Sequence, residues 1–119
     1  MSEMANVMAI NKLKSALKNK EEYGNDGYEF RSLITYKSNG KTVTEILQTV
    51  LIIGGYEPLV RIDSQEEGEI ITSDKYHMDF NPKFFKTSTF EFDSSADVLT
   101  IKGNSPKMGG DYTVEIQEV

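Results

Sequence analysis

One acidic stretch of the chain has the composition of a cation-binding loop. Residues 63–74 place Asp63 first, Gly68 sixth and Asp74 last in a twelve-residue segment, and these positions partly match a calcium loop. The match fails at Gln65, where a carboxylate ligand is usual, and Asp74 is shorter than the Glu expected at the last position. Both flanks favour strands rather than helices. A solvated turn is therefore the better interpretation, and no metal or cofactor is predicted.

His77, the single histidine, is the residue best suited to acid–base chemistry near neutral pH. It shares one face of a predicted strand with Lys75 and Asp79, and a neighbouring carboxylate would support a general base. One histidine on a strand does not define a catalytic triad, however, and no glycine-rich phosphate-binding motif is present. The chain has no cysteine, which excludes thiol catalysis and thiolate metal sites. These features indicate a protein that is not an enzyme.

Negative charge is concentrated in the middle of the chain. The formal net charge is −6, and residues 63–79 alone hold six acids against one lysine, which gives −5. Clustered like charges repel, and a basic partner would relieve that repulsion and be steered towards the site. Plain solubility is the alternative explanation. The predicted contact surface for a basic protein consists of Asp63, Glu66, Glu67, Glu69 and Asp74, together with the neighbouring Phe84 and Phe85.

The aromatic residues support a second hypothesis, a β-barrel that binds a small ligand. The chain holds six tyrosines and six phenylalanines, and several would point inwards in a closed barrel. In a sheet that packs against a helix, the same side chains would simply be core. Under the ligand hypothesis the pocket is lined by Tyr28, Phe30, Tyr36, Tyr76 and Tyr112.

A β-hairpin over residues 28–53 is the element expected to organise the fold. Asn39-Gly40 is typical of a two-residue type I′ turn, because both residues tolerate positive φ. Residues 42–53 also fit a capped helix, but their β-branched side chains favour a strand. One face of the hairpin would be aromatic and aliphatic and would need a core to cover it. The expected cross-strand pairs are Tyr36 with Val43, Ser32 with Leu47, and Tyr28 with Leu51.

A helix is predicted before the hairpin, over residues 3–23, with Gly24 as its stop. It is expected to lie on the rim or mouth of the sheet. The alternative is a partner-binding or oligomerisation helix, for which the methionines at 1, 4 and 8 would be suited. Its apolar stripe consists of Met4, Val7, Ile10, Leu13 or Lys14, and Leu17.

Short strands separated by turns are predicted after the hairpin. They cover residues 59–62, 69–72, 75–80, 85–93, 98–102 and 112–117, with a turn at 93–97 and a loose loop at 103–110. The predicted fold class is mainly β (α+β), with a helical segment at 1–24 and an antiparallel meander of about eight strands over 28–119. A single domain, 1–119, would close as a small barrel or a strongly curved sheet.

Composition and charge exclude several classes of function. No basic cluster is present that could neutralise nucleic-acid phosphates. The longest apolar run, residues 50–53, is far too short to cross a membrane, and no secretory signal pattern is present. The sequence therefore predicts a cytoplasmic, non-catalytic acidic protein of the inhibitor, immunity or nucleic-acid-mimic type. Its partner would be a protein with a basic surface, and a homo-oligomer is a further option.

Overall fold

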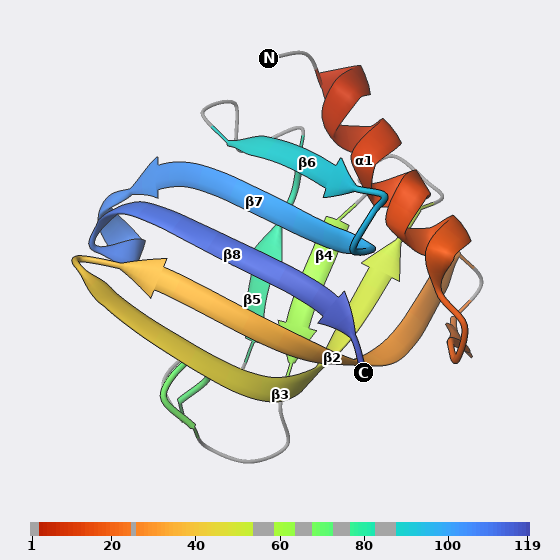
Figure 1. The fold of residues 1–119 in the computed structure, drawn as a ribbon, viewed down its shortest axis with the longest axis horizontal. Helices are drawn as coiled ribbons and strands as arrows, with labels where there is room; N and C mark the ends of the chain where they lie inside the picture. Colours follow the sequence, from red (N-terminus) through yellow and green to blue (C-terminus); the bar gives the residue numbers. More distant parts are fainter. Residues whose placement is uncertain (1–2, 25, 54–58, 64–67, 73–76, 83–87) are drawn as a thin grey trace.

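In the residues that the structure describes, eight antiparallel strands form a curled half-barrel sheet, and one helix precedes them in the chain (Figure 1). The computed structural model describes residues 3–24, 26–53, 59–63, 68–72, 77–82 and 88–119. The elements are α1 (Glu3–Ala16), β1 (Glu21–Tyr23), β2 (Gly27–Ser38), β3 (Lys41–Ile52), β4 (Leu59–Asp63), β5 (His77–Phe80), β6 (Thr89–Asp93), β7 (Val98–Ser105), the 3-10 turn η1 (Pro106–Met108) and β8 (Gly110–Glu118). Neighbouring strands follow the order β5-β4-β3-β2-β8-β7-β6, and β1 pairs with the start of β2. The predicted fold class is confirmed.

The β2–β3 hairpin has the predicted turn and register. Asn39 and Gly40 have φ angles of 54° and 73°, as a type I′ turn requires. All three predicted cross-strand pairs are present, and residues 42–53 are strand rather than helix up to Ile52. The turn chemistry therefore fixes which residues of both strands share a face.

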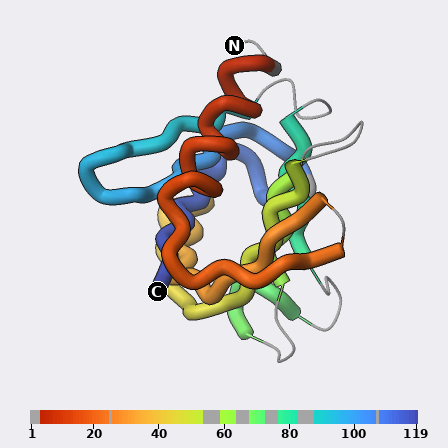
Figure 2. The backbone as a smooth tube through the Cα atoms, turned by 90° about the vertical axis from the view of Figure 1, so that its right-hand side faces the viewer, coloured from red at the N-terminus to blue at the C-terminus, as the bar shows by residue number. Residues whose placement is uncertain are grey.

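The inner face of the sheet is filled by one continuous hydrophobic core. Phe30 and Ile34 from β2 meet Leu51 from β3, Ile62 from β4 and Ile116 from β8 in it. In Figure 2 the backbone runs around this region, with α1 on one side and β4 on the other. Two buried polar residues of the inner face, Ser32 and Thr49, form hydrogen bonds. Their hydroxyl oxygens lie 2.6 Å apart, and the Ser32 hydroxyl donates to the Leu47 carbonyl at 2.8 Å.

Helix α1 covers the edge of β6, the last strand of the described sheet order. Its Ala9, Ile10 and Leu13 enter the core, while Asn6 is buried beside the strand edge. The Asn6 amide donates to the carbonyl of Ser88 at 3.2 Å and accepts from the N–H of Phe90 at 3.0 Å. One side-chain amide thus makes the two bonds that a neighbouring strand would make, which protects the edge from pairing with another chain.

The predicted helix was too long at its C-terminal end. The helix ends at Ala16, and residues 21–23 instead form β1, in which Tyr23 pairs with Gly27. The Glu118 carboxylate accepts hydrogen bonds from the backbone N–H groups of Lys18 (2.8 Å) and Asn19 (2.7 Å), so a residue of β8 fixes the chain just beyond the helix. Gly24, with φ of 62°, lies in the β1–β2 turn rather than at a helix stop.

Two other predictions about elements were wrong. The loose loop expected at 103–110 is almost entirely ordered structure, since β7 continues to Ser105 and β8 begins at Gly110. Only η1 and Gly109, with φ of 82°, lie between them. Met4 was placed in the buried stripe of the helix, but it is 73% exposed. The side of α1 that is buried consists instead of Asn6, Ala9, Ile10 and Leu13.

Tyr112 illustrates how closely the core is packed. Its hydroxyl lies 2.9 Å from the Ser88 hydroxyl, and burial raises the pKa of the phenol above its ordinary value of 10.0. Its cross-strand partner on β7 is Gly103, where an added Cβ would lie 2.6 Å from the Tyr112 hydroxyl. A side chain at position 103 would therefore displace the tyrosine or the strand.

We predict that Asn6→Ala lowers the free energy of unfolding by roughly 2–4 kcal/mol, because it leaves a buried carbonyl and a buried N–H without partners. Chemical denaturation measures this difference. Asn11→Ala on the same helix is the matched control and should cost less than about 1 kcal/mol. If both variants lowered the free energy of unfolding equally, the hydrogen bonds of Asn6 to the β6 edge would contribute no more than an ordinary surface contact.

We also predict a pH effect from Tyr112. Its folded-state pKa is raised, so its contribution to stability is complete below the unfolded pKa near 10.0 and is lost as the pH rises through the folded value. Urea denaturation from about pH 8 to about pH 11 should show a decline that is smaller in Tyr112→Phe than in wild type. Tyr23→Phe, at an exposed position, should follow the wild-type curve. An unchanged slope in Tyr112→Phe would contradict the assignment.

Candidate protein-binding surface

The acidic segment of the sequence starts and ends at one corner of the sheet. Asp63, the last residue of β4, is the cross-strand partner of His77, the first residue of β5. The two strands that this segment connects therefore lie side by side where β4 ends and β5 begins. We call this place the acidic corner, defined by Asp63, His77 and the chain between them. Both flanks are strands, as expected, and not the two helices of a calcium-binding loop.

Ile70 and Ile71 anchor the described middle part of this segment to the core. Their side chains are 3% and 2% exposed, respectively, and the N–H of Gly68 donates to the Ile71 carbonyl at 2.7 Å. The strand predicted for residues 69–72 was wrong, because these residues form a bend instead. Glu69, which precedes Ile70, stays exposed and lies 3.5 Å from the Lys41 ammonium. The two isoleucines hold the bend down, so the carboxylate of Glu69 is presented to solvent beside the sheet.

Glu45 holds the same bend from the inner face of β3. It lies opposite Ile34, and its carboxylate accepts a 2.7 Å hydrogen bond from the N–H of Ile70. The carboxylate also lies against Gly68, where an added Cβ would collide with it. Sequence reasoning did not identify this residue. An acid between Val43 and Leu47, at a position that alternation assigns to the inner face, was the available sign that Glu45 has a structural partner.

On the outer face, the acidic corner continues into an ion-pair cluster. Arg61 donates to both carboxylate oxygens of Asp79, at 2.8 and 3.0 Å. That hydrogen bond raises the pKa of the Arg61 guanidinium above its ordinary value, although desolvation acts in the opposite direction. The Nε2 atom of His77 lies 3.5 Å from the same carboxylate. Asp79 is therefore already neutralised by Arg61. Of the corner's described acids, Glu69 pairs with Lys41 through an exposed contact, and Asp63 makes no ion pair with another described residue.

The residues of the ligand hypothesis do not surround a common space. Phe30 and Tyr112 are buried in the core, and the Tyr36 hydroxyl donates to the Met108 carbonyl at 3.3 Å. The ring of Tyr28 lies under the ammonium groups of Lys14 and Lys20, at 5.2 and 5.7 Å from its centroid. Side chains of the core occupy the inner face, so these four residues contribute to packing and to cation–π contacts.

Six of the predicted site residues lie outside the described residues. They are Glu66, Glu67, Asp74, Tyr76, Phe84 and Phe85. Among the residues that are described, no group of three or more His, Asp or Glu side chains is placed to hold a metal ion.

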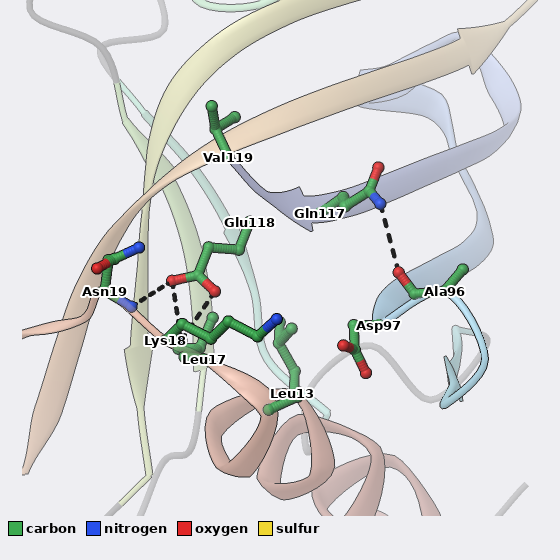
Figure 3. Close-up of a pocket in the computed structure, with 10 residues that line it drawn as sticks. Leu13, Leu17, Lys18, Asn19, Ala96, Asp97, Gln117, Glu118 and Val119 are labelled. Atoms are coloured by element: carbon green, nitrogen blue, oxygen red, sulfur yellow. Dashed lines mark hydrogen bonds between the residues drawn. The ribbon is translucent and has the colours of Figure 1, made fainter.

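A separate pocket of about 300 Å³ lies between the end of α1, the β6–β7 turn and the end of β8 (Figure 3). Leu13 and Leu17 form its apolar part, and Lys18 and Asp97 lie at its polar rim. The Gln117 amide donates to the Ala96 carbonyl at 3.3 Å across one side. No sequence pattern predicted this pocket, because the three elements around it are brought together only by the fold.

We predict that Glu45→Ala loosens the bend of the acidic corner. Loss of the carboxylate leaves the Ile70 N–H without its acceptor, which should cost roughly 1–3 kcal/mol and speed hydrogen exchange at the Ile70 amide. Glu45→Gln is the control, since its amide oxygen can still accept. Protection of Ile70 that is unchanged in Glu45→Ala would contradict the role assigned to this carboxylate.

In the part of the chain that the structure describes, no helix has the length and apolar character needed to cross a membrane. Comparison of the chain with protein-family models, with curated protein sequences and with solved structures gives no match. Inference about function therefore starts from the geometry of this chain alone.

Proposed function

We propose that this protein is a non-catalytic, acidic interaction protein that binds a basic surface of another protein through the acidic corner. The observation that carries the proposal is the pairing of Asp63 with His77. It brings the two ends of residues 63–77, a segment with a net charge of −4 (five acids and one lysine), to one place on the sheet. An inhibitor, an immunity protein or a nucleic-acid mimic would use charge in this way, and the cytoplasm is the compartment we propose.

The described part of the corner supports this proposal electrostatically. The side chain of Glu69 is 66% exposed, so its charge is available to a partner at little desolvation cost. Ile70, buried next to it, keeps the backbone fixed. Exposed charges of this kind contribute mainly to the association rate and to salt dependence. A fixed bend that presents acids suits a partner with a complementary basic surface.

The alternative, a barrel with a small ligand inside, has less support. It requires an interior space, whereas the inner face carries the continuous core that includes Phe30 and Tyr112. Catalysis also has little support, because the carboxylate beside His77, that of Asp79, already binds the Arg61 guanidinium through both oxygens, which leaves it a weaker partner for a general base. Binding on the outer surface remains the function that the geometry supports best.

The test uses the triple variant Glu66→Gln, Glu67→Gln and Glu69→Gln. The probe is a fluorescein-labelled peptide rich in lysine and arginine, with binding followed by anisotropy at about 50 mM and about 300 mM salt. We expect the triple variant to bind about tenfold or more weakly at low salt, with a flatter salt dependence, because three charges that attract the peptide are removed. Circular dichroism should show an unchanged fold.

The matched control changes net charge equally at another place. Glu21→Gln, Glu22→Gln and Asp26→Asn remove three exposed acids of β1 and the β1–β2 turn. This control should keep nearly the wild-type affinity. If both triple variants lose affinity to the same extent, only overall charge matters. If neither loses affinity, the acidic corner serves solubility alone.

A further inference from the structure

The turn of the β2–β3 hairpin, Asn39-Gly40, places a reactive side chain directly before a reactive backbone nitrogen. The Asn39 amide carbon, Cγ, is open to attack by a nucleophile, and the nitrogen of the next residue is the nearest one in the chain. Gly40 has no Cβ, so no side chain shields that nitrogen. Of the seven asparagines in the chain, only Asn39 precedes a glycine. Among the asparagines, it is therefore the one whose side chain is most open to its own backbone.

The reaction of such a pair closes a five-membered imide. The Gly40 nitrogen bonds to the Asn39 Cγ, the Cγ–Nδ2 bond breaks, and the side-chain nitrogen leaves as ammonia with the Gly40 proton. Water then opens the imide, so neither an oxidant nor a reductant takes part. Opening at the side-chain carbonyl gives aspartate. Opening at the main-chain carbonyl gives isoaspartate, whose backbone runs through Cβ and Cγ and is one atom longer.

Water reaches both reacting groups at the tip of the hairpin. Asn39 and Gly40 are exposed and line an open hollow of about 440 Å³ together with Asp111. In the part of the chain that the structure describes, the Gly40 N–H and the Asn39 side chain make no hydrogen bond. Neither burial nor hydrogen bonding therefore protects this pair.

The conformation of the folded turn keeps the two groups apart instead. Imide closure needs the Gly40 nitrogen on the same side of Asn39 as its Cβ. Asn39 has φ of 54°, and the first residue of a type I′ turn has ψ of about +30°, which points the next nitrogen away from Cβ. The Asn39 side chain also packs against Gly109, where an added Cβ would collide with Nδ2. The amide thus lies beside η1 rather than beside the Gly40 nitrogen.

Two hydrogen bonds hold the tip in this closed form. The Ser38 hydroxyl, directly before the turn, donates to the Met108 carbonyl at 2.7 Å. The Tyr36 hydroxyl donates to the same carbonyl at 3.3 Å. Both bonds join the end of β2 to η1. Rotation of Asn39 into the reactive conformation therefore requires the tip to detach from η1 and the type I′ turn to open.

We propose that Asn39 is a modification site gated by conformation, where isoaspartate forms only in molecules whose hairpin has opened. The closed turn keeps Asn39 intact, and opening of the tip or of the whole chain allows the imide to form. An isoaspartyl backbone is one atom too long for the two-residue turn, so the register of β2 and β3 is lost. Modification then removes opened molecules permanently from the folded population. This inference concerns the hairpin tip and does not depend on the acidic corner.

The test follows deamidation of the full chain by peptide mapping and mass spectrometry. Samples are incubated at mildly alkaline pH, either in buffer or in enough guanidinium chloride to unfold the chain. We expect Asn39 to react at least about tenfold more slowly in buffer, because only the opened fraction reacts. Asn11 and Asn19 precede lysines and are internal references, which should stay nearly unmodified in both samples.

Two variants assign the product and separate charge from backbone length. Asn39→Gly keeps a residue that accepts positive φ but has no amide, so the deamidated product should disappear. Asn39→Asp carries the charge of the deamidated protein on a normal backbone and should refold like wild type. Isoaspartyl protein, purified from the reacted sample, has the same charge and should refold with a lower midpoint of chemical denaturation than Asn39→Asp.

Three results would overturn the proposal. The first is deamidation of Asn39 that is as fast in buffer as in guanidinium chloride, because the folded turn would then not gate the reaction. The second is an isoaspartyl protein as stable as Asn39→Asp, because the turn would then tolerate the longer backbone. The third is the absence of product at Asn39 even in the unfolded chain.

Discussion

The register of the β2–β3 hairpin is the constraint on which the rest of the structure depends. Positive φ angles at Asn39 and Gly40 set a two-residue turn, and the turn sets every cross-strand pair of both long strands. A slip by one residue would turn Phe30 and Ile34 of β2 to the face opposite that of Leu51 in β3. Strands β4 and β8 pair with the outer edges of this hairpin, so they inherit its inner and outer faces. The position of the core, of the bend in the acidic corner and of α1 all follow from which side chains face inwards.

Sequence reasoning succeeded where local chemistry decides the structure and failed where a distant contact does. The turn at 39–40 and the alternation of β2 are local, and both were predicted. The end of α1 depends on Glu118 in β8, and the bend at residues 69–72 depends on Glu45 in β3. No periodicity within either segment reports such a contact. Residues 103–110 contain glycine and proline, which indicate a loop, yet pairing with β8 keeps β7 extended as far as Ser105.

The two surfaces of interest differ in the same way. The acidic corner was visible in the sequence because charge density is a local property, and the structure adds the fact that its ends meet at Asp63 and His77. The pocket of Figure 3 was not visible, since it combines Leu13 and Leu17 with Asp97 and Gln117, which lie far away in sequence. The methionines of α1 did suggest a contact surface, but only the packed helix shows that Met4 and Met8 stay outside the core.

Asn6 has a consequence for the order in which the chain folds. The groups that it binds on β6 are 82 and 84 residues away, and the Lys18 N–H bonds to Glu118 across 100 residues. Closing such long loops is entropically costly, and proteins dominated by distant contacts fold slowly. As the ribosome makes the chain, α1 emerges before the strands that it contacts and can be fixed only after β6 and then β8 have been synthesised. The helix is thus made before these strands and is among the last elements to dock, and until then the β6 edge stays open to other strands.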